Sequence, residues 1–129
     1  MSATQATTVN EAVISELARQ AHKIAQEKGF WDQPDPFIAE ACTKLLLIST
    51  EVSEATEALR DSYRDGPPHQ YTGLTEKQSS DFIEELADIV IRTFDLAASL
   101  QGMAPDLGVT IIEKMATNRQ RPQKHSKRF

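Results

Sequence analysis

The feature that most constrains the fold is an apolar stripe with helical spacing between residues 36 and 64. Its members are separated alternately by three and four residues, and they are Ile38, Ala41, Leu45, Ile48, Val52, Ala55 and Leu59. This alternation places apolar side chains along one side of an α-helix, as helix bundles require. Asp35 and Pro36 suit the start of the helix. Residues 65–68 (DGPP) cannot continue it, so we expect it to end near Arg64.

Three further segments carry helical periods. The first opens at a possible capping box, Thr8 with Glu11, and ends near Lys28 before Gly29. Another is capped by Thr75 and Gln78 and ends at Gly102, and the last runs from Pro105 to about 121. No alternating β pattern of useful length is present. The sequence therefore predicts an all-α bundle of four or five helices.

Length and composition indicate one domain. The chain has 129 residues with 40% apolar content, which suits a single compact unit spanning 1–129. We expect flexible tails at 1–7 and 123–129 and a long loop at 65–79. A domain of this size buries only about two thirds of its unfolded surface, so oligomerisation would help it. The chain has a single cysteine, Cys42, which excludes an internal disulfide and fits a protein of the reducing cytoplasm. We expect Cys42 to be a packing residue.

Charge and hydropathy exclude several classes of protein. The longest apolar run, 45–48, is too short to span a membrane, and the N-terminus lacks the pattern of a signal peptide. A net charge of −5 argues against binding of nucleic acid polymers. Residues 114–129 nevertheless hold six of the fourteen basic residues and no acidic one. An acidic body with a basic end indicates complementarity around an anionic ligand, within a chain or between subunits.

Two acidic pairs stand out, Glu51/Glu54 and Glu85/Asp88. Residues i and i+3 of a helix are neighbours, roughly 5–6 Å apart at Cβ, so each pair can close on one cation. The chain has five such acidic pairs where about three would arise by chance. These two are distinguished by bordering apolar faces, where carboxylates need a balancing positive charge. The other reading is a solvated acidic surface.

If both pairs converge, they form a site made of oxygen ligands alone. Such ligands suit Mg²⁺, which binds carboxylates together with substrate phosphates. Four carboxylates carry more negative charge than one divalent ion neutralises, so two or more ions are plausible. No His or Cys occupies these positions, which disfavours zinc.

The order E-x-x-E, spacer, E-x-x-D, followed by EKMATNRQRPQKHSKRF, resembles the MazG-like nucleotide pyrophosphohydrolases of the all-α NTP pyrophosphatase superfamily. The resemblance runs from about Leu45 to Phe129, and EELADIVIR adds to it. The connection at 65–79 is longer than is usual in that family. His69 and Tyr71 within it could fold over a bound nucleotide or lie on the surface.

The resemblance implies hydrolysis of (deoxy)nucleoside triphosphates between the α and β phosphates, giving a monophosphate and pyrophosphate. The cofactor would be Mg²⁺, with Mn²⁺ as a possible substitute, and the role would be nucleotide-pool house-cleaning. The metal ligands would be Glu51, Glu54, Glu85 and Asp88. Glu51 and Glu54 are the catalytic candidates, with Glu54 able to take a proton from the attacking water. The family also implies a cytoplasmic homodimer or homotetramer, in which a site is often completed across subunits.

Six further residues are candidates for substrate binding. Lys114, Asn118 and Arg121 share one helical face and match residues that contact phosphates in the family, although a basic helix end would look similar. The other three are His22, Trp31 and Lys44. Trp31 could stack on a base beside His22, or be a hydrophobic plug. Lys44 could contact a phosphate or serve as a counter-charge.

Three other functions remain as alternatives. A di-iron carboxylate protein requires Glu-x-x-His on two helices, and no histidine here follows a Glu at that spacing. A helical scaffold would explain the apolar stripes but not the acids that border them. A catalytically silent nucleotide-binding protein would keep the fold without turnover, and the intact acidic pairs argue against it.

Overall fold

The computed structural model describes residues 2–32, 35–60, 69 and 72–121, and within them the chain is helical without strands. The four helices are α1 (Ala3–Glu27), α2 (Phe37–Arg60), α3 (Glu76–Ala98) and α4 (Leu107–Gln120). The prediction of an all-α fold is confirmed. None of the described helices has both the length and the apolar character needed to cross a membrane.

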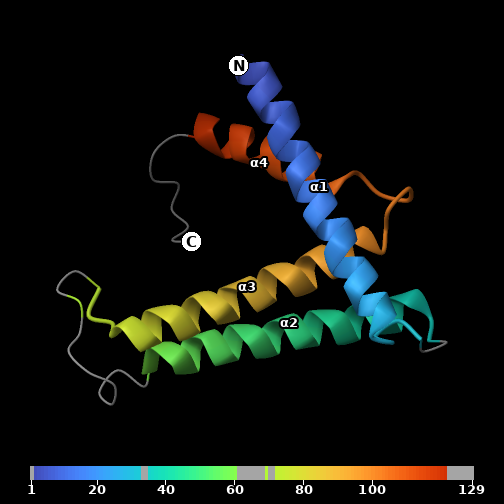
Figure 1. The fold of residues 1–129 in the computed structure, drawn as a ribbon. Coiled ribbons are helices and arrows are strands. Elements are labelled where there is room, and N and C mark those ends of the chain that lie inside the picture. The colour runs from blue at the N-terminus through green and yellow to red at the C-terminus, as the bar shows by residue number, and fades with distance from the viewer. Residues whose placement is uncertain (1, 33–34, 61–68, 70–71, 122–129) are drawn as a thin grey trace.

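An antiparallel pair of helices forms the centre of the fold (Figure 1). α2 and α3 lie side by side over most of their length. α1 crosses this pair where α2 begins and α3 ends, and it packs against α3. α4 lies against α1 with a lighter contact to α3, and among the described helices it makes no contact with α2. One chain therefore forms an open arrangement of helices rather than a closed bundle.

α1 begins earlier than the sequence indicated. Ser2 is its N-cap and forms a capping box with Gln5, in which Ser2 N–H donates to Gln5 Oε1 at 2.8 Å. Thr8, the predicted cap, lies inside the helix and donates its hydroxyl to the carbonyl of Thr4. Residues 3–7, predicted to be a flexible tail, are therefore the first turns of α1. Two capping boxes of similar quality lay in the same segment, and the chain uses the outer one.

The start of α3 follows the prediction. Thr75 is the N-cap and forms a capping box with Gln78, and both side chains are almost fully buried. Residues 76–79 of the predicted loop are thus helical. His69 joins a turn with Gly73 and Leu74, whereas Tyr71 and the tail 123–129 lie outside the described residues.

α4 is attached to α1 at its first turn. Asp106 caps α4 and its Oδ1 accepts a hydrogen bond from the Ser15 hydroxyl of α1 at 2.6 Å. Gly108 lies so close to α1 that a Cβ there would meet the carbonyl oxygen of Glu11 at 2.5 Å. Only glycine allows this approach of the two backbones. Residues at the start of α4 therefore fix its position beside α1.

The interface between α2 and α3 is polar. The buried residues of α2 are Lys44, Glu51 and Ala55, and those of α3 are Gln78 and Asp95. In the described chain the only buried hydrophobic residues are alanines. The most deeply enclosed part of the fold therefore consists largely of hydrogen-bonding and charged groups, which require partners.

Large apolar side chains lie on the outside of the single chain. Four members of the predicted stripe, spaced by seven residues, are exposed: Ile38, Leu45, Val52 and Leu59. Ala55 is buried, and Ala41 and Ile48 are half-buried. Cys42, predicted to be a packing residue, is exposed. The whole stripe was predicted to face the core. Instead α2 is rotated so that Lys44 and Glu51 face α3, and α3 covers only one edge of the stripe.

Candidate functional site

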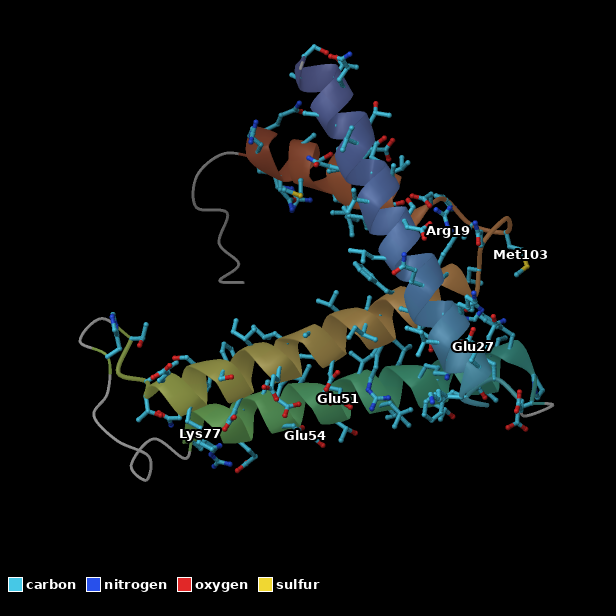
Figure 2. All side chains as sticks on the ribbon, in the orientation of Figure 1. Arg19, Glu27, Glu51, Glu54, Lys77 and Met103 are labelled. Carbon is cyan, nitrogen blue, oxygen red and sulfur yellow. The ribbon has the colours of Figure 1, made fainter. Side chains whose placement is uncertain are left out.

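Three of the four predicted carboxylates converge between α2 and α3. Glu51 and Glu54 come from α2 and Glu85 from α3, and one oxygen of each lies within 4.8 Å of the others. Figure 2 shows Glu51 and Glu54 on successive turns of α2, along the side where α3 runs. Glu51 is buried, Glu85 half-buried and Glu54 exposed. The site is therefore enclosed at Glu51 and open to solvent at Glu54.

Asp88 does not join this carboxylate cluster (Glu51, Glu54 and Glu85) in the described structure. It is exposed on α3, one turn beyond Glu85. Its charge still acts on the cluster, since it is one of the carboxylates that raise the pKa of Glu85. The sequence predicted four ligands from two i,i+3 pairs. The second pair divides because Glu85 faces the helix interface and Asp88 lies at its outer side.

The electrostatics of the cluster are unfavourable without added positive charge. The pKa of Glu85 is raised, first by desolvation and then by Coulomb repulsion from Glu54, Glu51 and Asp88. One ion pair offsets this charge: Nη2 of Arg92 lies 2.6 Å from Oε1 of Glu51. As the one cation paired with the cluster among the described residues, this guanidinium leaves the three carboxylates with excess negative charge.

The residues present fit a hard divalent cation. All donors in the cluster are carboxylate oxygens, the ligand type that Mg²⁺ and Mn²⁺ accept and that zinc sites rarely use alone. The oxygen separations allow the three groups to turn toward one point without movement of the helices. Glu51, Glu54 and Glu85 are therefore the residues that could hold an ion.

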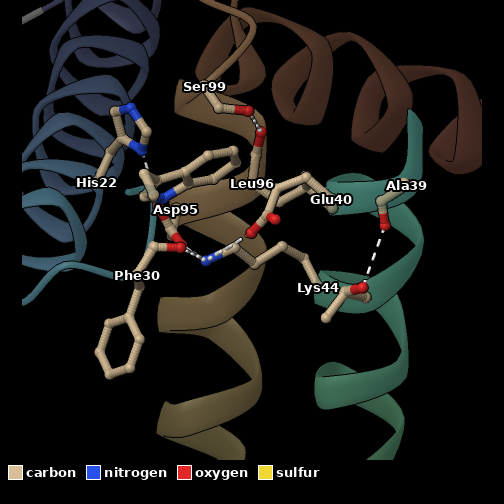
Figure 3. A network of polar contacts seen from close by, with 10 residues as sticks. His22, Phe30, Ala39, Glu40, Lys44, Asp95, Leu96 and Ser99 are labelled. Carbon is tan, nitrogen blue, oxygen red and sulfur yellow. Dashed lines mark hydrogen bonds and ion pairs between the residues drawn. The ribbon is translucent and has the colours of Figure 1, made fainter. Parts of the chain in front are cut away.

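A second polar cluster lies where α1, α2 and α3 meet (Figure 3). Its centre is the buried carboxylate of Asp95 on α3. Oδ1 of Asp95 accepts from Nδ1 of His22 at 2.7 Å and from Nε1 of Trp31 at 2.8 Å. His22 comes from α1 and Trp31 from the turn after it, so Asp95 joins this part of the chain to α3. We call His22, Trp31, Lys44 and Asp95 the Asp95 network.

Lys44 completes this network from α2. Its Nζ donates to the carbonyl of Phe30 at 3.0 Å and lies 3.6 Å from carboxylate oxygens of both Asp95 and Glu40. It also lies 4.4 Å from the ring centroid of Trp31, a cation–π contact. Of the two readings of Lys44, the structure supports the counter-charge, and its partners are Asp95 and Glu40 rather than the carboxylate cluster.

These contacts define what His22 and Trp31 can offer a ligand. The two rings meet edge to face with centroids 5.1 Å apart. Nδ1 of His22 and Nε1 of Trp31 are occupied by Asp95, and Lys44 lies over the Trp31 ring. Among the described residues no contact uses Nε2 of His22, whereas Lys44 covers one face of the Trp31 ring and His22 meets this ring edge to face. Lys44 precedes Glu51 by seven residues, so the network lies about two helical turns, roughly 10 Å, from the carboxylate cluster.

The three predicted phosphate-binding residues of α4 lie elsewhere. Lys114 and Asn118 are exposed on α4, and Arg121 is its exposed C-cap. Because α4 packs on α1 and makes no contact with α2 among the described helices, the structure does not bring these residues to the carboxylates of the same chain.

Sequence reasoning missed Asp95 and Arg92. A signal for both was available in the heptad spacing of α3, where Arg92 follows Glu85 by seven residues and Asp95 follows Asp88 by seven. Residues seven apart lie on nearly the same side of a helix. An extension of the acidic pairs by two turns would have named both residues as candidates, but the burial of Asp95 follows from the packing of α1 against α3.

We predict that Glu85→Gln stabilises the ion-free protein at neutral pH. A raised pKa means that Glu85 loses its proton at higher pH in the folded chain than in the unfolded chain, so ionisation lowers stability as pH rises through that range. The neutral amide removes this effect. Thermal unfolding in EDTA should show a higher Tm for Glu85→Gln at pH 7–8 and no difference near pH 4, just below the usual Glu pKa of about 4.3.

In the presence of Mg²⁺, wild type should have a higher Tm than Glu85→Gln. Wild type should gain Tm as the ion concentration rises, and Glu85→Gln should gain much less because it lacks one ligand. Glu76→Gln, at the exposed first turn of the same helix, is the matched control outside the cluster. Equal Mg²⁺ responses of wild type and Glu85→Gln would contradict an ion site at Glu85.

We predict that Asp95→Ala destabilises the fold by about 2–4 kcal/mol, because it leaves the His22 and Trp31 donors without their acceptor and takes a counter-charge from Lys44. Urea unfolding measures the loss. Trp31 is the only tryptophan, so its emission reports on this network directly. Asp81→Ala, which removes an exposed partner of Lys77, should cost less than about 1 kcal/mol. Similar losses in both variants would show that the network contributes little.

Comparisons of the chain with protein-family models, with curated proteins and with solved structures found no match. The resemblance to MazG-like pyrophosphohydrolases therefore rests on the motif residues named above. The positions of the carboxylate cluster and the Asp95 network come from the fold of this chain alone.

Proposed function

We propose that the protein is a Mg²⁺-dependent hydrolase of (deoxy)nucleoside triphosphates that cleaves the α–β phosphate bond and releases a monophosphate and pyrophosphate. The observation that supports this most directly is the convergence of Glu51, Glu54 and Glu85 from two helices. Their sequence context, E-x-x-E followed by E-x-x-D, is the part of the resemblance that carries the metal ligands. Mn²⁺ is the expected substitute.

The differing burial of the glutamates supports separate roles. Glu51 is 6% exposed and enclosed between the helices, which suits a ligand whose carboxylate is held in place. Glu54 is exposed and so can reach solvent water, which suits the acceptor of a proton from the attacking water. A divalent ion held by these carboxylates would neutralise phosphate charge and polarise a phosphoryl oxygen.

The Asp95 network supports a place for the nucleobase. A base could stack on the face of the Trp31 ring opposite Lys44, and Nε2 of His22 could exchange a hydrogen bond with a base edge. The network lies about two turns of α2 from Glu51, a separation that a nucleotide can bridge. Asp95 and Lys44 would act by holding Trp31 and His22 in place.

The distance of α4 from the carboxylates supports a shared site. If Lys114, Asn118 and Arg121 contact phosphates, a second chain must supply them, because α4 of the same chain does not reach α2. The exposed stripe of Ile38, Leu45, Val52 and Leu59 offers an apolar surface on which a second copy could pack. We therefore propose a homodimer or a homotetramer that acts in the cytoplasm on unwanted or excess nucleotides.

Turnover tests the reaction. With Mg²⁺, the protein should release pyrophosphate and a monophosphate from some member of a panel of ribo- and deoxynucleoside triphosphates. Glu54→Gln should lower kcat by about 10²-fold or more, as expected for loss of a general base, while it keeps the helical content. Glu57→Gln, one turn further along α2 and exposed, is the control. Orthophosphate as the product would contradict cleavage at the α–β bond.

A full panel without turnover would leave two outcomes. Binding of nucleotides that quenches or shifts Trp31 emission would identify a silent nucleotide-binding protein. Absence of both turnover and binding, with assembly retained, would favour the helical scaffold.

The oligomer is tested by charge on the exposed stripe. Leu45→Glu and Val52→Glu place carboxylates where a partner's apolar surface would lie, and burial of an unpaired charge costs several kcal/mol. Light scattering should show an assembly of two or four chains for wild type and smaller species for these variants. Thr43→Glu, at an exposed polar position on the opposite side of α2, should leave the mass unchanged. A monomeric wild type would contradict the shared site.

A further inference from the structure

We propose that Arg92 is an exchangeable partner of the carboxylate cluster: it pairs with Glu51 in the ligand-free protein and contacts a phosphate when a polyphosphate binds. This inference rests on the proposed function and adds a binding residue to the same site. It concerns a residue of α3 that the acidic motifs do not include.

The geometry places Arg92 at the enclosed end of the cluster. Arg92 follows Glu85 by seven residues on α3, and Nη2 reaches across the helix interface to Oε1 of Glu51 at 2.6 Å. The Glu51 side chain is 7% exposed and the Arg92 side chain 42% exposed. One end of this ion pair is therefore fixed and enclosed, whereas the other has access to solvent.

The charge of Glu51 requires a partner, and Arg92 provides it. A buried carboxylate without a counter-charge is strongly unfavourable, and Glu54 and Glu85 beside it add repulsion, which also raises the pKa of Glu85. A divalent cation and Arg92 would satisfy the same need of Glu51. The two positive groups therefore compete, and Arg92 should weaken cation binding to the ligand-free protein.

The cations of α2 are committed elsewhere. Lys44 is held by Glu40, Asp95 and the Phe30 carbonyl, and Arg60 pairs with Glu57 on the outside of α2. Those of α4 lie on a helix that does not contact α2. Arg92 therefore supplies the guanidinium that lies beside the carboxylate cluster and could contact a phosphate. Its planar, multiple donors suit phosphate oxygens better than a lysine does.

The exchange predicts opposite effects on two ligands. In Arg92→Gln, removal of the competing charge should tighten binding of Mg²⁺ alone by about threefold or more. The same variant should bind pyrophosphate in saturating Mg²⁺ about 10- to 100-fold more weakly, because charged hydrogen bonds are lost. Isothermal titration of Mg²⁺ and of pyrophosphate measures both, and circular dichroism checks the fold.

Two further variants make the result specific. Arg19→Gln removes an arginine that pairs with Glu16 on α1, and it should change neither affinity. Arg92→Lys keeps the charge but loses the guanidinium fork, so its Mg²⁺ affinity should stay near wild type while pyrophosphate binds more weakly. This variant also keeps the test intact if Arg92→Gln fails to fold.

The outcomes separate this inference from the proposed function. If wild type binds Mg²⁺ and turns over nucleotides, but Arg92→Gln weakens both ligands, Arg92 only positions Glu51 and the exchange is wrong. Unchanged affinities in both Arg92 variants would overturn it as well. If wild type binds neither Mg²⁺ nor pyrophosphate and shows no turnover, the proposed function fails, and this inference fails with it.

Discussion

The structure depends on the polar interface between α2 and α3. Buried charges are unfavourable unless they are paired, and this interface encloses Glu51, Lys44 and Asp95 with partners from three helices. The pairing holds α2 and α3 in one register and joins the end of α1 to α3 through His22 and Trp31. Arg92 serves the same purpose at the carboxylate cluster. Most helix pairs bury apolar side chains between them, whereas the buried side chains between α2 and α3 belong largely to the candidate site.

The exposed apolar surface of α2 follows from the polar side chains buried between α2 and α3. Since the buried positions between α2 and α3 are mostly polar, the leucines of α2 and Ile38 are exposed, and one chain has no further layer to cover them. The buried hydrophobic residues in the described part of the chain are alanines, so one copy has little of the apolar burial that usually stabilises a fold. Association of chains would supply both the missing burial and the α4 cations. Stability and completion of the site are thus linked in the proposal.

The two polar clusters have different roles in the proposed function: one would bind an ion and phosphates, and the other would bind the base. The carboxylate cluster has excess negative charge and opens to solvent at Glu54, which suits an ion and a phosphate chain. In the Asp95 network the carboxylate of Asp95 is balanced by Lys44 and accepts a hydrogen bond from His22, so the network would offer a base the Trp31 ring and one histidine nitrogen rather than an unpaired charge. An ion site needs unsatisfied charge, whereas a base platform needs rigid positioning. The differing electrostatics of the clusters match these separate requirements.

The sequence by itself determined the helices and the acids that could act together. Periodicity, capping residues and turn breakers predicted all four helices, because these signals act over a few residues, although α1 starts at Ala3 rather than beyond Thr8. Spacing predicted that Glu51 and Glu54 share a side of α2. Only the tertiary structure decided that Glu85 joins them without Asp88 and that Arg92 pairs with Glu51. It also decided that Asp95 is the buried acceptor of His22 and Trp31, and that α4 lies away from α2. Those outcomes depend on how each helix is rotated and placed against its neighbours, which local sequence signals do not specify.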